Sequence, residues 1–381
     1  LTLSSLECSE VQLVYLNLGN NTSLTHLACG GNQLTTLDVS QNTSLTSLEC
    51  VSNQLSTLDV SQNTSLVSLY CRDNQLTNLD ISQNTLLERL YCSNNQLTSL
   101  DVIQNTLLRG LECSNNQLSA LDVSQNTSLT SLACYSNQLT TLDVTQNTLL
   151  TGLNCSNNQL SILDVSQNNL LVGLRCSNNQ ISNLDLINKH DLENPVICHH
   201  NQLTNLFLSD SITSMKALDC SHNLIDSINF TRTARPNNIS IQEFDISNNS
   251  LTNFQLGRFL TGTIKCDSNQ LTNLDLRVDP SFGYNSNNLG FIYANHNPDL
   301  HCISVDDTAY SNANWTIGIT DPNLSDILFD PQVSFSDDCD ALVAAAPKTY
   351  VPDDNFEAYL EANGMGDGIA NNDSVLTANI N

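Results

Sequence analysis

The sequence predicts a β-rich solenoid, a right-handed coil with two short parallel sheets and few helices. A 21-residue pattern recurs in strict register, with its first leucine at Leu3, Leu24, Leu45, Leu66, Leu87, Leu108, Leu129, Leu150 and Leu171. Each period holds two half-motifs, L-x-x-L-x-C-x-x-N-x-L and L-x-x-L-D-V-S-x-N, and each half-motif contains the alternation of a half-buried strand. Each coil should therefore carry two short strands and hide its leucines only against the neighbouring coils.

This pattern closely resembles the nested, IRREKO-type class of bacterial leucine-rich repeats, whose consensus is L-x-x-L-x-C-x-x-N-x-L-x-x-L-D-x-x-x-N. The resemblance covers roughly residues 3–300. It implies a leucine-rich-repeat fold and a secreted surface protein like those of Bacteroidota.

Seven cysteines occupy one identical position of the repeat: Cys50, Cys71, Cys92, Cys113, Cys134, Cys155 and Cys176. Neighbouring rungs of a parallel ladder point side by side, which does not suit the demanding geometry of a disulfide. We therefore expect small, inward-facing, reduced thiols that behave as buried hydrophobic residues.

Two asparagine positions recur in the same way. The first comprises Asn53, Asn74, Asn95, Asn116, Asn137, Asn158 and Asn179, and the second comprises Asn63, Asn84, Asn105, Asn126 and Asn147. We expect both sets to be buried, with their amides satisfying backbone groups where the chain turns at opposite corners of the coil.

The formal net charge is −27, with only 12 basic residues among 381, which argues against binding to nucleic acid or to an anionic membrane surface. Much of this charge forms one ladder: Asp38, Asp59, Asp80, Asp101, Asp122, Asp143, Asp164 and Asp185. Like charges at this spacing repel one another. Either flanking hydroxyls and water satisfy these carboxylates, or cations such as calcium lie along the ladder; no cofactor is otherwise expected.

The pattern divides the chain into four parts. Residues 1–300 form a solenoid of about 14 coils, residues 301–340 a C-terminal cap, residues 341–349 a linker, and residues 350–381 a cap-like segment of a following repeat module. Cys302 and Cys339 lie off the ladder and are expected to form a disulfide; two free thiols are the alternative. No apolar run is long enough to span a bilayer.

The tail suggests assembly. When residue 381 is joined to residue 1, Leu376 aligns with Leu37 and the repeat continues in phase. One hypothesis is that the chain is a period of a tandem array, as covalent copies or by end-to-end self-association. The contacts would then involve Phe356, Tyr359, Leu360 and Leu376. A truncated chain with a disordered tail is the alternative.

Outward positions that vary between coils indicate where an unknown protein or glycan could bind. These candidates are Tyr70, Arg72, Arg89, Tyr91, Glu112 and Tyr135. Variation without selection on a solvated face is the alternative. His200 and His222 lie on adjacent rungs, but the cysteines beside them should face inward, so no metal site is expected.

Short Asp-Ser/Thr-apolar patterns mark possible O-glycosylation at Ser211, Ser227, Thr308 and Ser374. No catalytic or nucleotide-binding motif occurs, so no enzyme is expected. The sequence thus indicates a non-catalytic extracellular or cell-surface protein. It would be a module of an adhesin or fibre-like assembly, or alternatively a lateral binding module that uses its variable outward ladder.

Overall fold

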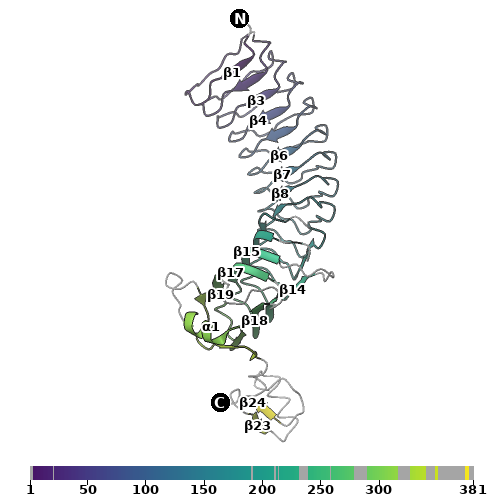
Figure 1. Ribbon diagram of the computed structural model, residues 1–381. Helices are drawn as coiled ribbons and strands as arrows, with labels where there is room; N and C mark the ends of the chain where they lie inside the picture. The colour runs from purple at the N-terminus through teal and green to yellow at the C-terminus, as the bar shows by residue number, and fades with distance from the viewer. Residues whose placement is uncertain are drawn as a thin grey trace.

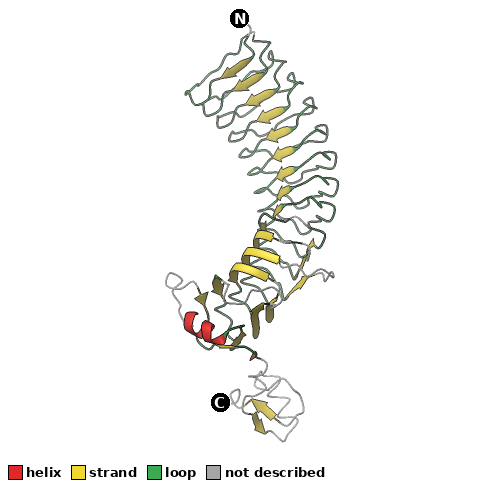
Figure 2. Ribbon diagram, viewed as in Figure 1, coloured by secondary structure: helices red, strands yellow, loops and turns green. Residues whose placement is uncertain are grey.

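The computed structural model describes residues 3–19, 21–189, 192–209, 212, 214–230, 239–257, 259–278, 290–315, 327–339, 348–350 and 374–376. The described chain winds into a parallel β-solenoid whose coils stack as an arc (Figure 1). The predicted fold class is therefore confirmed. The described part of the chain contains one helix, α1 (Thr308–Asn314), which is red in Figure 2. No described helix has the length and apolar character needed to cross a membrane.

One long sheet runs through the solenoid. Among the described residues it has 15 strands, all paired in parallel. In order, they are β1 (Ser5–Glu7), β2 (His26–Ala28), β3 (Ser47–Glu49), β4 (Ser68–Tyr70), β5 (Arg89–Tyr91), β6 (Gly110–Glu112), β7 (Ser131–Ala133), β8 (Gly152–Asn154), β9 (Gly173–Arg175), β11 (Val196–Ile197), β13 (Ser214–Asp219), β15 (Ile239–Asp245), β17 (Phe259–Lys265), β19 (Phe291–Tyr293) and β21 (Ile327–Leu328).

The core is a stack of identical layers. In the fourth coil Leu66, Leu69, Cys71 and Leu76 are completely buried. Twelve cysteines of the described chain carry free thiols, and all except Cys8 are buried. Burial raises the pKa of Cys71 to about 12, so the thiol stays protonated at neutral pH. The ladder cysteines therefore act as packing groups, as the sequence predicted.

The first asparagine ladder closes the turn after each strand of the long sheet. Asn53 Oδ1 accepts the Leu34 N–H (3.0 Å) of the preceding coil. Its Nδ2 donates to Cys29 O (3.0 Å) and Cys50 O (3.1 Å), which lie in different coils. One amide thus satisfies buried backbone groups of two coils, and the same bonds recur at Asn74, Asn95 and Asn116.

The second asparagine ladder explains a departure from the predicted structure. In the nine regular coils the L-D-V half-motif forms no strand before Leu184. There the Val60 carbonyl accepts from the Asn63 N–H of its own turn (3.0 Å) and from Asn84 Nδ2 of the next coil (2.9 Å). Ser61 N–H donates to Asp59 Oδ1 (2.9 Å). Side chains therefore occupy backbone groups that a strand ladder would need.

Strands begin on this side of the coil where the ladder stops. Asn168 is its last asparagine, and Lys189 takes the next rung. From there on, two further parallel sheets form within the described residues. One consists of β10 (Leu184–Leu186), β12 (Asn205–Leu208) and β14 (Ser227–Phe230), and the other of β16 (Asn253–Gly257), β18 (Asn273–Val278), β20 (Cys302–Ser304) and β22 (Ser334–Ser336).

Replacing Lys189 by asparagine should stabilise the protein. Lys189 is buried, its Nζ has only long contacts to Ser166 O (3.4 Å) and Asn169 Oδ1 (3.5 Å), and burial lowers its pKa. An asparagine could instead donate to the carbonyls of the coil before, as Asn168 does. We expect a gain of about 1 kcal/mol in the free energy of unfolding, measured by urea titration. Lys189→Met removes the charge without supplying an amide and should gain less; an equal gain would contradict the ladder explanation.

The predicted cap continues both sides of the solenoid, because β21 joins the long sheet and β22 pairs with β20. Trp315, Phe329 and Phe335 pack together with ring centroids 5.3–6.0 Å apart and cover the last apolar layer. Cys302 and Cys339 form a disulfide with Cα atoms 5.8 Å apart, the pairing that the sequence predicted.

The C-terminal tail contains two described strands. β23 (Lys348–Tyr350) pairs antiparallel with β24 (Ser374–Leu376), and Figure 1 places them beyond the capped end of the solenoid. Leu376 therefore pairs with Lys348 of the expected linker, in contrast to the coil position suggested by its alignment with Leu37. Phe356, Tyr359 and Leu360 lie outside the described residues.

Candidate functional site

The outward face of the long sheet presents side chains in columns. Because the strands pair with an offset of 21 residues, Glu49, Tyr70, Tyr91, Glu112 and Ala133 form one column. A second column contains Ser47, Ser68, Arg89, Gly110 and Ser131. The inward leucines between these columns are invariant from coil to coil, so the scaffold does not determine which outward residues occur.

Two tyrosines form the centre of this face. The rings of Tyr70 and Tyr91 pack edge to face with centroids 5.0 Å apart. A Cβ atom placed on Gly110 would lie 3.3 Å from the Tyr91 hydroxyl oxygen and 3.4 Å from its Cε1, so the ring lies across the glycine on the next rung. Gly110 therefore positions Tyr91, a role that the motif analysis missed.

Three arginines lie on the two coils of the tyrosine pair and on the coil that follows them. Arg72, Arg89 and Arg109 are the only basic residues among the first 174, and they fall on three successive coils. Arg72 Nε lies 3.9 Å from Asp73 Oδ2, and Arg109 Nε lies 3.7 Å from Glu88 Oε2; all four side chains are exposed to solvent. Within the described residues Arg89 has no carboxylate within 4.0 Å. Arg109 was also missed, although the scarcity of basic residues could have revealed it.

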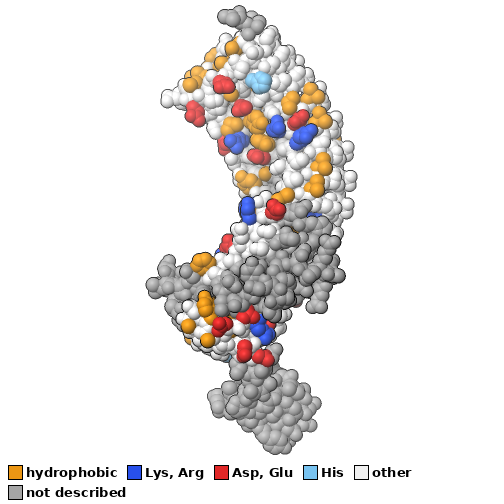
Figure 3. All heavy atoms as spheres, viewed as in Figure 1, with side chains coloured by type: hydrophobic (Ala, Val, Ile, Leu, Met, Phe, Trp, Pro, Cys, Tyr) orange, Lys and Arg blue, Asp and Glu red, His pale blue; other side chains and the backbone are white. Residues whose placement is uncertain are grey.

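We call Tyr70, Arg72, Arg89, Tyr91, Arg109 and Glu112 the Tyr/Arg patch. Partial burial raises the pKa of Tyr91, and Glu112 on the adjacent rung adds to the effect. Figure 3 shows basic and apolar side chains gathered on the upper half of the visible face. Tyr135 lies outside the patch, because Ser93 and Ser114 occupy the two rungs between it and Arg72.

The aspartate ladder lies on the side formed by the second half-motif. Ser40 N–H donates to Asp38 Oδ1 (2.9 Å), and the Ser40 side chain and N–H together hold the pKa of Asp38 below its ordinary value. In Asp143 both the N–H (2.9 Å) and the hydroxyl (2.7 Å) of Thr145 donate to one carboxylate oxygen. Flanking residues thus satisfy the ladder as one of the two predicted alternatives requires, and calcium along it stays a prediction.

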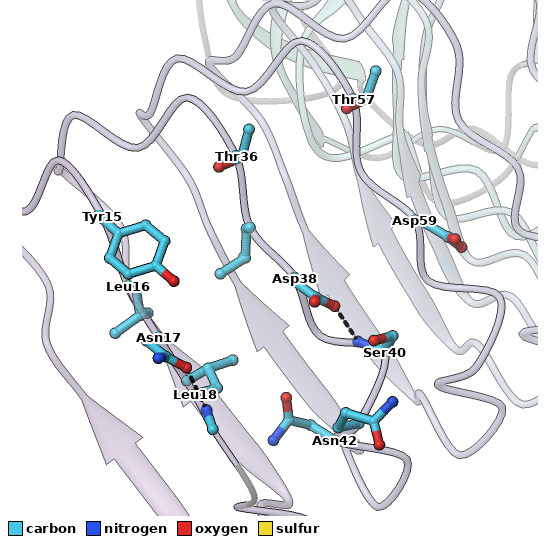
Figure 4. A pocket seen from close by; sticks show the side chains of 13 residues that line it. Tyr15, Leu16, Asn17, Leu18, Thr36, Asp38, Ser40, Asn42, Thr57 and Asp59 are labelled. Carbon is cyan, nitrogen blue, oxygen red and sulfur yellow. Dashed lines mark hydrogen bonds between the residues drawn. The ribbon is translucent and has the colours of Figure 1, made fainter.

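A shallow groove of about 420 Å³ opens beside this ladder in the first three coils. Figure 4 shows the Tyr15 ring at one end and Asp59 at the other, with Asp38 between them. A second groove of about 360 Å³ lies further along the same side, next to Ile162 and Asp164.

The histidines on adjacent rungs do meet. The rings of His200 and His222 stack with centroids 4.2 Å apart, and the Nδ1 atoms of His199 and His200 are 2.9 Å apart. Burial and the two neighbouring imidazoles lower the pKa of His200. In the described parts of the chain, no group of three or more histidine, cysteine or acidic side chains could hold a metal ion.

The candidate glycosylation residues lie in different settings. Ser227 is half-buried in β14 and its hydroxyl donates to Asn205 Oδ1 (3.0 Å). Thr308 is half-buried at the first position of α1, where Asp307 caps the helix. Ser374 begins β24, and Ser211 lies outside the described residues. Modification at these positions stays a prediction.

No protein-family model and no curated protein sequence matches this chain. Among solved structures, the chain is similar to the functional domain of InlJ from Listeria monocytogenes, which is described as including a cysteine ladder. The two are 32% identical, with a TM-score of 0.56, over 80% of this chain and 68% of that domain. In this chain the ladder cysteines form a column of free thiols, all buried except Cys8.

Two further bacterial structures have the same fold. The leucine-rich-repeat protein LIC12759 of Leptospira interrogans is 20% identical, with a TM-score of 0.52, over 87% of this chain and 90% of that one. The internalin InlF of Listeria monocytogenes is 20% identical, with a TM-score of 0.52, over 89% and 84%. With its repeat, its stacked parallel coils and this likeness to InlJ, the chain belongs to the leucine-rich-repeat proteins.

Proposed function

We propose that this chain is a non-catalytic, extracellular protein-binding module whose partner contacts the Tyr/Arg patch. The observation that carries the proposal is the packed pair of Tyr70 and Tyr91 on rungs where the scaffold requires neither residue. Tyrosine and arginine are the side chains that most often dominate binding energy at protein interfaces. The patch lies on the outward face of a sheet, and an open sheet face suits a protein surface better than a small substrate.

An extracellular location is supported by two features. The Cys302–Cys339 disulfide suits an oxidising compartment. The net charge of −27 favours solubility and disfavours contact with nucleic acid and anionic lipid. The Tyr/Arg patch combines three arginines with acidic neighbours, so it is the part of the first nine coils where an acidic partner meets the least repulsion.

Removing the two rings should weaken binding strongly. We expect Tyr70→Ala/Tyr91→Ala to weaken capture of a cell-surface partner by a factor of about 30 or more, because hot-spot truncations cost about 2 kcal/mol or more. Partners would be captured on immobilised wild-type protein, identified, and their affinity measured with purified components. The variant should unfold at the same urea concentration as the wild type, because both side chains lie on the outward face.

Gly110 provides a sharper test than truncation. Gly110→Ser keeps both tyrosines but should push the Tyr91 ring aside and reduce the affinity. Gly152→Ser is the matched control, since it changes the same strand position two coils further on, where a Cβ would have no atom within 4 Å. Unchanged affinity in both the double-alanine and Gly110→Ser variants would contradict the proposed site.

A second proposal is that the chain is a module of an end-to-end assembly such as an adhesin. It is supported by the sequence alignment in which Leu376 matches Leu37 and the repeat then continues in phase into the first coil. We place this proposal second because β24, the strand that contains Leu376, already pairs with β23 of the same chain. Deleting residues 348–381 should shorten or abolish assemblies seen by electron microscopy but leave lateral binding intact. Assemblies that survive the deletion would contradict this proposal.

A further inference from the structure

The groove beside Tyr15 is bounded on one side by the Tyr15 side chain itself. Tyr15 occupies the repeat position held by Thr36 and Thr57 in the next two coils. It is 66% exposed and forms a wall that the two threonines do not continue. The second groove forms in the same way beside Ile162, which is 74% exposed and occupies the same repeat position.

The lining of the first groove combines three kinds of group. The wall is the aromatic ring of Tyr15, the half-buried Leu16 and the buried Leu18 and Leu37 provide apolar surface, and hydroxyl, carboxylate and amide groups form the rest. The residues that matter for the argument are Tyr15, Leu16, Thr36, Asp38, Thr57 and Asp59. The groove of about 420 Å³ lies within the size range of small-molecule sites, about 300–1,000 Å³.

The two carboxylates are fixed hydrogen-bond acceptors. Asp38 Oδ1 accepts the Ser40 N–H and Asp59 Oδ1 accepts the Ser61 N–H, each at 2.9 Å. These turns hold the side chains in place and lower the pKa of both groups, so they are ionised at neutral pH. An acceptor that is already ordered loses little entropy when a ligand donates to it.

Charge excludes one class of ligand. The first 71 residues contain no lysine or arginine, so the groove offers no cation to an anionic ligand. A ligand here must present hydrogen-bond donors to the carboxylates and an apolar surface to the tyrosine. Sugar rings do both: their hydroxyls donate, and their C–H groups carry the partial positive charge that the face of an aromatic ring attracts.

We propose that this groove binds a neutral oligosaccharide, with one sugar ring against Tyr15 and its hydroxyls donating to Asp38 and Asp59. The hydroxyls of Thr36 and Thr57 border the same groove and can both donate and accept. The groove lies on the side of the aspartate ladder, whereas the Tyr/Arg patch lies on the outward face of the long sheet. The proposal is therefore independent of the proposed protein contact.

The experiment is isothermal titration of the full chain with cellotriose, chitotriose and mannotriose, each at millimolar concentration. We expect at least one trisaccharide to bind, with an affinity that changes little between low and high salt. Tyr15→Ala should weaken binding about tenfold, as loss of an aromatic contact of about 1.4 kcal/mol requires, and Asp59→Asn should weaken it too. Tyr15→Phe, which keeps the ring, should retain most of the affinity.

Two controls separate this site from others. Ile162→Ala changes the second groove, and Tyr70→Ala/Tyr91→Ala changes the Tyr/Arg patch; neither should affect the trisaccharide. Failure of all three sugars to bind would overturn the proposal, as would binding that Tyr15→Ala leaves unchanged. Salt-sensitive binding of tri-arginine, lost in Asp59→Asn, together with no binding of any of the three sugars, would assign the groove to a cationic peptide instead.

Discussion

Asn116→Ala should lower the free energy of unfolding by about 4 kcal/mol. Asn116 Nδ2 donates to Cys92 O (3.1 Å), Cys113 O (3.1 Å) and Ser114 O (3.3 Å), while its Oδ1 accepts the Leu97 N–H (2.9 Å). Alanine would remove these four hydrogen bonds, at about 1 kcal/mol each, and would leave the buried Leu97 N–H without its acceptor. The three carbonyls would keep one donor each, from Asn95 Nδ2, Asn137 Nδ2 and the Asn94 N–H. Urea titration followed by circular dichroism measures the change.

The second asparagine ladder supplies the matched comparison. Asn126 Nδ2 donates to Val102 O and Asn105 O, both at 2.9 Å, but its buried Oδ1 has no partner. Asn126→Ala should therefore cost less, about 2 kcal/mol. Asn116→Asp should cost at least as much as Asn116→Ala, because an oxygen would then face three carbonyls. A larger cost for Asn126→Ala than for Asn116→Ala would contradict this account of the two corners.

Replacing Cys302 and Cys339 by serine should destabilise the capped end by about 4 kcal/mol. The disulfide closes a loop with a sequence separation of 37. Without it the unfolded chain gains conformational entropy, which lowers the free energy of the unfolded state by about 4 kcal/mol for a loop of this length. Each coil of a solenoid contacts only its neighbours, so the effect should stay local. Hydrogen exchange should rise sharply over residues 290–315 and 327–339 and stay unchanged in the first coils.

Reductant offers a control without mutation. Dithiothreitol should reproduce the local increase in exchange in the wild-type protein, because the free thiols of the ladder are already reduced. Cys113→Ala, which alters a buried ladder thiol in a regular coil, should leave the capped end unchanged. Protection of the capped end that survives both the serine substitutions and the reductant would show that Trp315, Phe329 and Phe335 hold it without the disulfide.

The repeat alone determined the architecture. A 21-residue period with leucines at fixed positions has one way to bury them, which is to stack coils, and the buried Leu66, Leu69 and Cys71 follow from that constraint. The asparagines of both corners followed as well, because each turn leaves backbone groups that a short amide can reach. Asn137 and Asn179 are the exceptions to the predicted burial, since both are only half-buried. The candidate tyrosines and Arg89 could be named because they vary where the scaffold does not.

Contacts between coils decided the rest. No pattern within one repeat says that Asn84 of the next coil takes the Val60 carbonyl and so prevents a second strand until the ladder ends before Lys189. The packing of Tyr70 on Tyr91, and of Tyr91 across Gly110, depends on register between coils. The groove beside Tyr15 depends on side-chain size in three neighbouring coils. Periodicity specifies which face each residue occupies, whereas a site is made of distances between coils, and those exist only once the coils are stacked.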